Sequence, residues 1–193
     1  MSNQKIRILA FAGSTREASC NKKLLKIAAD GAREAKADVT VIDLRDFAMP
    51  LYDGDLEAAT GLPEAALRLK ELMCAHHGFL IASPEYNSGY SAVLKNAIDW
   101  VSRPSTENEP GLLAFAGKTA SIMAAAPGAL GGLRGLYQLR ELLMNMRVFV
   151  HPNIRAVGNA MQVFSTTGDL TDVNLQAAIK MLGAQTVQAI QLQ

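Results

Sequence analysis

Short apolar runs alternate with amphipathic stretches along the whole chain. Five strands are predicted from the apolar runs at 6–12, 39–44, 78–83, 119–125 and 147–150. Apolar residues recur at helical spacing after each run, which predicts helices over about 21–35, 63–73, 93–101 and 132–146 and from about 171 onward. Five such units predict one α/β domain over residues 1–193, with a parallel sheet covered by helices on both faces.

Three loops follow strands at one edge of this predicted sheet. Ligands of such sheets bind beyond the carboxyl ends of the strands, so we expect one site to be lined by the loops at 13–21, 83–91 and 125–132. The segment 45–61 is the longest stretch on this edge without predicted structure, and we expect it to act as a lid or a subunit contact.

The first loop carries small hydroxyl side chains and one arginine between a strand and a helix. A helix start provides free N–H groups and a partial positive charge, and further donors come from Ser14, Thr15, Arg16, Ser19 and Asn21. The loop lacks the GxGxxG spacing of dinucleotide sites and the GxxxxGK[ST] pattern of triphosphate sites, so it suits a terminal monophosphate. Plainer roles stay open, with Asn21 as a helix N-cap and Arg16 as a solvated charge.

The second and third loops offer a place for a flat ligand. The second places Tyr86 and Tyr90 after a buried strand, where a planar heterocycle would stack on an aromatic face; an ordinary loop is the alternative. The third, at 126–132, is nearly bare of side chains, which favours either a close approach of backbone to a ligand or a plain strand-to-helix turn. Trp100 falls too far along its helix to reach the second loop, so we expect it to pack in the core.

The overall composition argues against several function classes. A formal net charge of +1 over 193 residues, without an apolar stretch near the roughly 20 residues that span a bilayer, indicates neither a nucleic-acid partner nor membrane insertion. Cys20 and Cys74 form no CxxC pair and suggest no disulfide framework. His76 and His77 suit a helix C-terminus and His151 suits a loop, so no metal site is expected. These features predict a cytoplasmic protein.

Three ordered motifs resemble the motif set of the NADPH-dependent FMN reductase family, which includes bacterial chromate, quinone and azo-dye reductases. They are Gly13-Ser14-x-Arg16-x-x-Ser19-x-Asn21, Pro84-Glu85-Tyr86-Asn87 and Leu94-Lys95-Asn96-Ala97-Ile98-Asp99-Trp100. The likeness extends to the fourth helix, through Gly131-Gly132-Leu133-Arg134 and Tyr137-x-Leu139-Arg140, and fades after about Val150. It implies a flavodoxin-like three-layer sandwich with a five-stranded parallel sheet in the order 2-1-3-4-5.

The resemblance also implies an FMN site. The cofactor-binding residues expected on this basis are Ser14, Arg16, Ser19, Cys20 and Asn21 around the phosphate, Pro84, Glu85, Tyr86, Asn87 and Ser88 along the isoalloxazine ring, and Ala126 and Gly128 on its other side. The chain departs from the family's pattern at Ala126, where Ser is frequent, and at Ser91, where Pro is common. The first departure predicts one fewer hydroxyl contact, and the second predicts a less rigid loop.

An FMN site of this kind predicts an oxidoreductase. Hydride would pass from NADPH or NADH to flavin N5 and on to a quinone or another small electrophile, so no catalytic side chain is expected. Backbone donors of the second loop would stabilise the reduced ring. The sequence favours neither nucleotide over the other.

Other functions stay open beside this one. A flavodoxin-type electron carrier that docks to proteins would share the fold and the cofactor, although a near-neutral chain argues against an acidic docking surface. Cys20, close to Arg16 at a helix start, is either a redox sensor or a bystander. Glu85 is either a general base or a carboxylate facing solvent. Asp43 as the ribose reader of a dinucleotide site is disfavoured by the missing glycines.

The fourth predicted helix is apolar over a wide arc, made by Leu133, Leu136, Tyr137, Leu139, Leu142, Leu143 and Met146. One face of it would pack on the sheet, and the other would form a subunit interface. Together with the resemblance, this arc predicts a homodimer or homotetramer.

Overall fold

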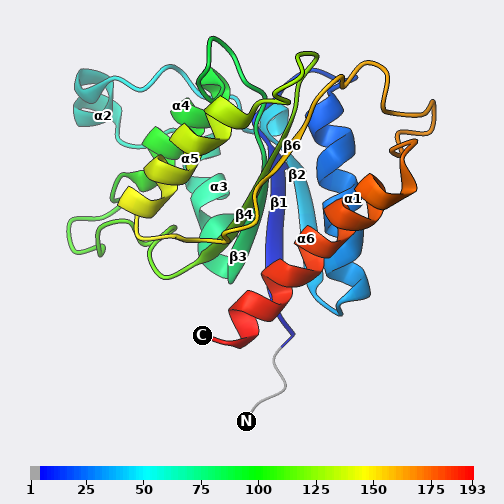
Figure 1. The fold of residues 1–193 in the computed structure, drawn as a ribbon. Helices are drawn as coiled ribbons and strands as arrows, with labels where there is room; N and C mark the ends of the chain where they lie inside the picture. The colour runs from blue at the N-terminus through cyan, green and yellow to red at the C-terminus, as the bar shows by residue number, and fades with distance from the viewer. Residues whose placement is uncertain (1–4) are drawn as a thin grey trace.

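The computed structural model describes residues 5–193, which form a parallel sheet between two layers of helices (Figure 1). The strands are β1 (Arg7–Ala12), β2 (Asp38–Asp43), β3 (Gly78–Ala82), β4 (Thr119–Ala125), β5 (Phe149–Val150) and β6 (Arg155–Val157). All pairs are parallel and the order is β2-β1-β3-β4-β5, with β6 also paired to β4. The predicted order and the flavodoxin-like architecture are therefore confirmed.

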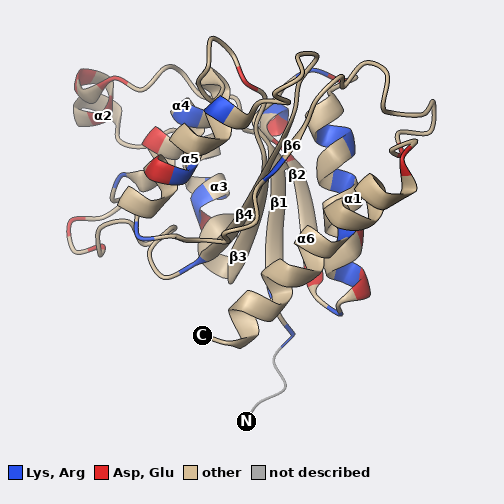
Figure 2. Cartoon of the chain, viewed as in Figure 1, with Lys and Arg blue, Asp and Glu red and all other residues tan. Residues whose placement is uncertain are grey.

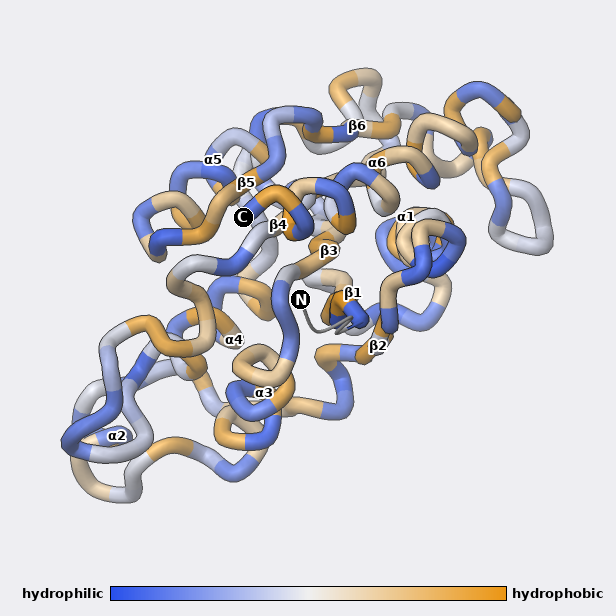
Figure 3. Tube along the Cα trace, turned by 90° about the horizontal axis from the view of Figure 1, so that it is seen from below, coloured by the Kyte–Doolittle hydropathy of each residue, from blue (hydrophilic) through white to orange (hydrophobic). Residues whose placement is uncertain are grey.

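Helices cover both faces of this sheet. They are α1 (Cys20–Glu34), α2 (Gly54–Thr60), α3 (Glu64–Ala75), α4 (Ala92–Ser102), α5 (Leu133–Asn145) and α6 (Val173–Gln191), with a short 3-10 helix, η1, at Leu44–Phe47. The α1 and α6 helices lie on one face, and α3, α4 and α5 lie on the other (Figures 1 and 3). Side chains alternate along β1, so Leu9 and Phe11 enter the α3–α5 cluster while Ile8 and Ala10 enter the α1–α6 cluster.

The α1 and α6 helices approach each other closely because glycines lie where they cross. A Cβ on Gly31 would lie 2.0 Å from the Lys180 carbonyl oxygen, and a Cβ on Gly183 would lie 1.9 Å from that of Ala28. No larger residue fits either position without moving backbone. This crossing packs the C-terminal half of α1, the helix that follows the first predicted loop, against α6.

The fifth strand is shorter than the pattern predicts, and it is interrupted. Strand β5 contains only Phe149 and Val150, because Arg147 takes a left-handed conformation (φ 63°) directly after α5. The chain leaves β4 around Pro152, which has no N–H to donate, and returns as β6. This last strand is absent from the prediction, and it proves important for the site.

The segment 45–61 is wrongly predicted to lack regular structure. It contains most of η1 and the whole of α2, whose N-cap Asp53 accepts hydrogen bonds from the first-turn N–H groups. The Pro50 carbonyl oxygen accepts hydrogen bonds from Trp100 Nε1 and Asn96 Nδ2, both at 2.8 Å. Trp100 is fully buried, which confirms its predicted packing role, and the segment is fastened to α4.

Most charged residues lie on the helices and loops (Figure 2). The strands carry Arg7, Asp38, Asp43 and Arg155, and the central strands β3 and β4 carry none. Within the described part of the chain, no helix combines the length and the apolar character needed to cross a membrane.

The outer face of α5 is less apolar than the predicted arc. Leu136, Leu139, Leu143 and Met146 are buried, and of the seven apolar residues in the arc only Tyr137 is exposed. Met144 of α5 is also exposed, as are Leu130 before the helix and Phe149 in β5.

Candidate functional site

The three predicted loops meet beyond the carboxyl ends of β1, β3 and β4. One pocket, of about 160 Å³, is lined by residues of all three loops, and an adjoining pocket of about 350 Å³ shares Glu85, Ala126 and Pro127 with it. Each of the twelve residues predicted to bind the cofactor lines one of these two pockets. The first pocket holds Ser14, Arg16, Ser19, Cys20, Asn21, Pro84 and Tyr86, the second holds Asn87, Ser88 and Gly128, and Glu85 and Ala126 border both.

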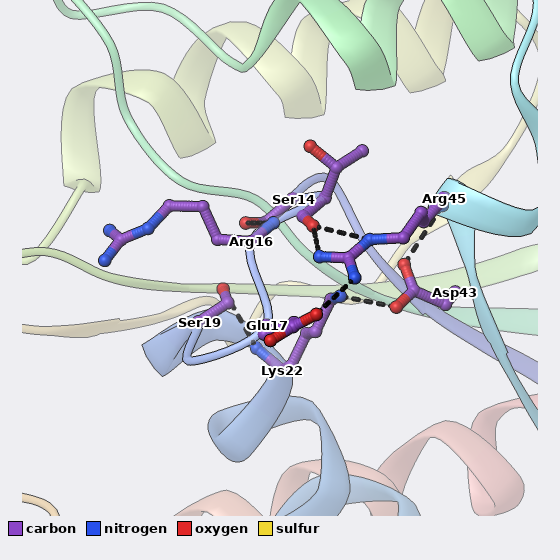
Figure 4. Close-up of polar contacts among 8 residues, drawn as sticks. Ser14, Arg16, Glu17, Ser19, Lys22, Asp43 and Arg45 are labelled. Atoms are coloured by element: carbon purple, nitrogen blue, oxygen red, sulfur yellow. Dashed lines mark hydrogen bonds and ion pairs between the residues drawn. The ribbon is translucent and has the colours of Figure 1, made fainter.

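One end of the first pocket is formed by the start of α1. Ser19 caps this helix by accepting a hydrogen bond from the Lys22 N–H at 3.4 Å, so the interpretation of Asn21 as the N-cap is wrong. Ser14 and Ser19 are buried, and Ser14 Oγ accepts a hydrogen bond from the Arg16 N–H at 3.4 Å. The Arg16 side chain is exposed and projects away from the loop on the side opposite Arg45 (Figure 4). Two hydroxyls, a guanidinium and the start of α1 therefore line one end of this pocket, and each is a kind of group that binds anions in proteins.

Asn21 ties the first loop to the third. Its amide Nδ2 donates to the Ala125 carbonyl oxygen and its Oδ1 accepts from the Ala125 N–H, each at 2.9 Å. The side chain is buried, so this paired contact fixes the start of α1 against the end of β4.

Ser91 ties the first loop to the second. Its hydroxyl donates to the Gly13 carbonyl oxygen at 2.6 Å and accepts from the Leu94 N–H at 3.3 Å, which caps α4. The departure from the family's proline thus adds a cap and a contact between two loops, where the sequence predicted only a loss of rigidity.

Glu85 ties the second loop to α5, and it does not face solvent as one interpretation had it. Its side chain is 9% exposed, it accepts from the Gly135 N–H at 2.9 Å, and it pairs with Arg134 Nη2 at 2.7 Å. Burial alone would raise the pKa of Glu85, but the Gly135 N–H and the Arg134 guanidinium outweigh burial and hold that pKa below its ordinary value. An ionised, doubly occupied carboxylate is poorly suited to act as a general base.

A tight turn forms the rim of the second loop. Tyr86 and Gly89 exchange backbone hydrogen bonds at 2.9 and 3.0 Å, with Asn87 and Ser88 between them at φ 50° and 69°. Tyr86 is exposed at the mouth of the first pocket, whereas Tyr90 packs partly buried against the α3–α5 cluster. Only one of the two predicted tyrosines is therefore available to stack on a ligand.

Glycines of the third loop pack mainly against the protein itself. A Cβ on Gly131 would lie 2.6 Å from backbone atoms of Val157 and Gly158, and Gly132 starts α5 in a left-handed conformation (φ 93°). Gly128 has open space around it in the second pocket. The loop is therefore a strand-to-helix turn, as one alternative predicts, and the close approach of its backbone to a ligand stays a prediction.

Sequence reasoning missed the segment after β6. Ala160 and Met161 line the first pocket. The Ala160 N–H donates to the Ala126 carbonyl oxygen at 3.1 Å, and Cys20 Sγ donates to the Ala160 carbonyl oxygen at 3.5 Å. The short run Arg155–Val157 followed by Gly-Asn was the available signal, but three residues are too few for a periodicity argument.

Several other candidates lie outside the pockets. Asp43 accepts hydrogen bonds from the Lys22 ammonium at 2.5 Å and from the Arg45 N–H at 3.0 Å. Burial alone would raise the pKa of Asp43, but these two partners outweigh burial and lower that pKa below its ordinary value. His76 is the buried C-cap of α3 and His151 follows β5 in a loop, as predicted. Within residues 5–193, no three His, Cys, Asp or Glu side chains gather as metal ligands do.

Comparison with known proteins gives a consistent relationship. The family model for NADPH-dependent FMN reductase matches residues 6–162. The NAD(P)H-dependent FMN reductase PA1204 of Pseudomonas aeruginosa is 35% identical, over 97% of this chain and 94% of its own length. The quinone reductase of Escherichia coli is 32% identical, over 88% and 87% of the two chains. Among solved structures, the flavoenzyme NAD(P)H:(acceptor) oxidoreductase FerB of Paracoccus denitrificans superposes with a TM-score of 0.77 at 26% identity, covering 96% of this chain and 97% of that one. The chain therefore belongs to the NADPH-dependent FMN reductase family.

Proposed function

We propose that the two adjoining pockets hold FMN, with its phosphate at the start of α1 and its ring between the second and third loops. That the protein is an oxidoreductase using FMN and NAD(P)H follows from its family. The placement in this chain rests on one observation. A helix start, two buried hydroxyls and Arg16 meet at one end of a pocket that Tyr86 and bare backbone line elsewhere.

The residues present fit such a ligand. Ser14 and Ser19 offer hydroxyl donors and Arg16 offers a charge-assisted donor to a terminal phosphate, which carries three acceptor oxygens. Tyr86 offers an exposed aromatic face at the pocket mouth. Ala126 brings no hydroxyl, so its contribution to binding is backbone and van der Waals contact.

When bound, FMN supplies the two-electron chemistry, taking hydride from NAD(P)H and passing electrons to a small acceptor. The chain's own residues bind and orient the cofactor. Glu85 stays ionised and occupied by Arg134 and Gly135, so no pocket side chain is assigned a proton transfer. We further propose that the acceptor is a quinone or a similar small electrophile, since two of the relatives named above are a quinone reductase and an NAD(P)H:(acceptor) oxidoreductase.

The placement is tested by titrating FMN and riboflavin into apoprotein variants and following flavin fluorescence. Arg16→Ala should weaken FMN binding about tenfold or more, the loss of one charged hydrogen bond of ~1.4 kcal/mol or more, and leave riboflavin binding unchanged. Arg33→Ala removes the same charge at the far end of α1 and should change neither. Equal weakening of FMN and riboflavin by Arg16→Ala would place the phosphate elsewhere.

The acceptor proposal is tested by NAD(P)H oxidation with a panel of quinones. The electron-carrier alternative is not favoured by the family, and direct oxidation of NAD(P)H by the purified protein separates the two functions. Protein that neither holds FMN nor oxidises NAD(P)H after FMN is added would overturn the proposal.

We also propose a homodimer or homotetramer in the cytoplasm. Tyr137 and Met144 are exposed seven residues apart on α5, so they share a face of the helix and offer a modest apolar contact surface. Light scattering coupled to size exclusion should show a dimer or tetramer, and Tyr137→Glu should shift it toward monomer. A wild-type monomer at micromolar concentration would contradict this assembly.

A further inference from the structure

The first loop is gripped from outside the pocket by Arg45, a residue that no motif highlights. Arg45 follows β2 in η1, and its side chain crosses to the loop, as Figure 4 shows. Its Nε donates to the Thr15 carbonyl oxygen at 3.0 Å, Nη2 donates to the same oxygen, and Nη1 pairs with Glu17 Oε1 at 2.9 Å. One rigid guanidinium therefore holds two points of the loop.

This contact determines the direction of a donor on the other side of the loop. No peptide bond in the described chain is cis, and in a trans peptide the C=O and the N–H point in opposite directions. The carbonyl of Thr15 and the N–H of Arg16 belong to the same peptide. With the carbonyl held by Arg45, that N–H is directed to the opposite side, where it meets Ser14 Oγ at 3.4 Å and where Ser14 and Arg16 line the pocket.

Arg45 is itself held by a second charged pair. Asp43 accepts from the Arg45 N–H at 3.0 Å and from the Lys22 ammonium at 2.5 Å, which joins η1 to the first turn of α1. The carboxylate of Asp43 caps η1. Neither Asp43 nor Lys22 lines the first pocket. Arg45 thus holds the loop at the Thr15 carbonyl, and the Lys22–Asp43 pair holds the start of the helix that follows the loop (Figure 4).

We propose that Arg45 is a positioning residue for phosphate binding, which sets the Thr15–Arg16 peptide in its ligand-ready orientation before the cofactor arrives. The inference rests on the proposed placement of the FMN phosphate at this loop. Arg45 lines neither of the two pockets, and its side chain hydrogen-bonds to Thr15 and Glu17, which line neither of them. Its effect is preorganisation, because a loop already held in place does not have to be ordered by the ligand.

The test compares Arg45→Ala, Arg45→Lys and Arg45→Ala/Glu17→Gln with wild type, by flavin fluorescence titration of the apoproteins with FMN and riboflavin. We expect Arg45→Ala to weaken FMN binding about tenfold, equivalent to ~1.4 kcal/mol, and to leave riboflavin binding within about twofold. Arg45→Lys keeps the charge but lacks the planar guanidinium that contacts Thr15 and Glu17 together, so it should retain only part of the FMN affinity that Arg45→Ala loses. Removing the charge of Glu17 in the double variant should not restore it.

A second readout is independent of the cofactor. Hydrogen–deuterium exchange of the apoprotein should increase within residues 14–19 in Arg45→Ala, while exchange in the strands stays as in wild type. Arg33→Ala serves as the matched control for both measurements.

The possible outcomes separate this inference from the proposed function. Wild-type affinity for FMN in Arg45→Ala, full recovery in Arg45→Lys or in the double variant, or an equal loss for riboflavin would each overturn the positioning role. Wild-type protein that binds no FMN, or that loses no affinity in Arg16→Ala, would instead overturn the phosphate placement, and the exchange measurement would still decide whether Arg45 orders the loop.

Discussion

Replacing Glu85 should show how much one buried carboxylate contributes to holding the pocket together. Glu85→Ala removes the acceptor of the Gly135 N–H at 2.9 Å and the partner of Arg134. A hydrogen bond to a charged group contributes ~1.5–3 kcal/mol. The Arg134 side chain is 59% exposed, so the ion pair adds at most ~1 kcal/mol. We expect the free energy of unfolding to fall by ~2–3 kcal/mol.

Glu85→Gln is the matched control, because its amide oxygen can still accept from Gly135 while the charge is lost. It should lower the free energy of unfolding by ~1 kcal/mol, about half the cost of the alanine change or less. Urea unfolding of the apoproteins, followed by far-ultraviolet circular dichroism, measures both values at pH 7. If the two variants cost the same, or neither costs anything, the carboxylate does not hold α5 to the second loop.

The pH dependence of this difference follows from the direction of the pKa shift. The pKa of Glu85 is lowered from its ordinary value of 4.5 in the folded protein, so the carboxylate stabilises the fold above that value. The stability gap between wild type and Glu85→Gln should be constant above about pH 5 and shrink as the pH falls through the folded pKa. A gap that widens on acidification would mean that Glu85 is protonated in the fold.

Two further changes test how the scaffold supports the site. Gly183→Ala puts a Cβ 1.9 Å from the Ala28 carbonyl oxygen and should lower the free energy of unfolding by ~3 kcal/mol or more. Gly54→Ala is the control, because Gly54 has open space around it and the change should be close to neutral. Thermal unfolding compares the two variants, and equal melting temperatures would disprove the close crossing of α1 and α6. Trp100→Phe loses the 2.8 Å hydrogen bond to Pro50 and should cost ~1 kcal/mol while speeding proteolysis within 48–60, and an unchanged cleavage rate there would show that other contacts hold the segment.

The sequence predicts the architecture well because its signals are local. Four of the five strand runs and the three loops are recognisable from periodicity and from residue type, and the structure brings those loops together as the topology rule requires. The fifth strand is present but shorter than its apolar run predicts, because Arg147 turns left-handed before it and Pro152 ends its pairing. The contribution of Ala160 and Met161 was hidden because contacts between distant segments leave no periodic pattern.

The same limit applies to what motif residues do. Asn21 and Glu85 belong to the motifs, yet the structure uses both mainly to tie loops to neighbouring elements, and Ser91 does likewise. Ser14 and Arg16 belong to the same motif as Asn21 and line the pocket, and the hydrogen bond described for them joins them to each other. A sequence motif does not distinguish residues that hold the loops in place from residues that line the pocket, because both kinds stand side by side in it. The two groups should separate in experiment, since changing a tie lowers stability and affinity together, whereas changing Arg16 lowers affinity for the phosphate-bearing flavin alone.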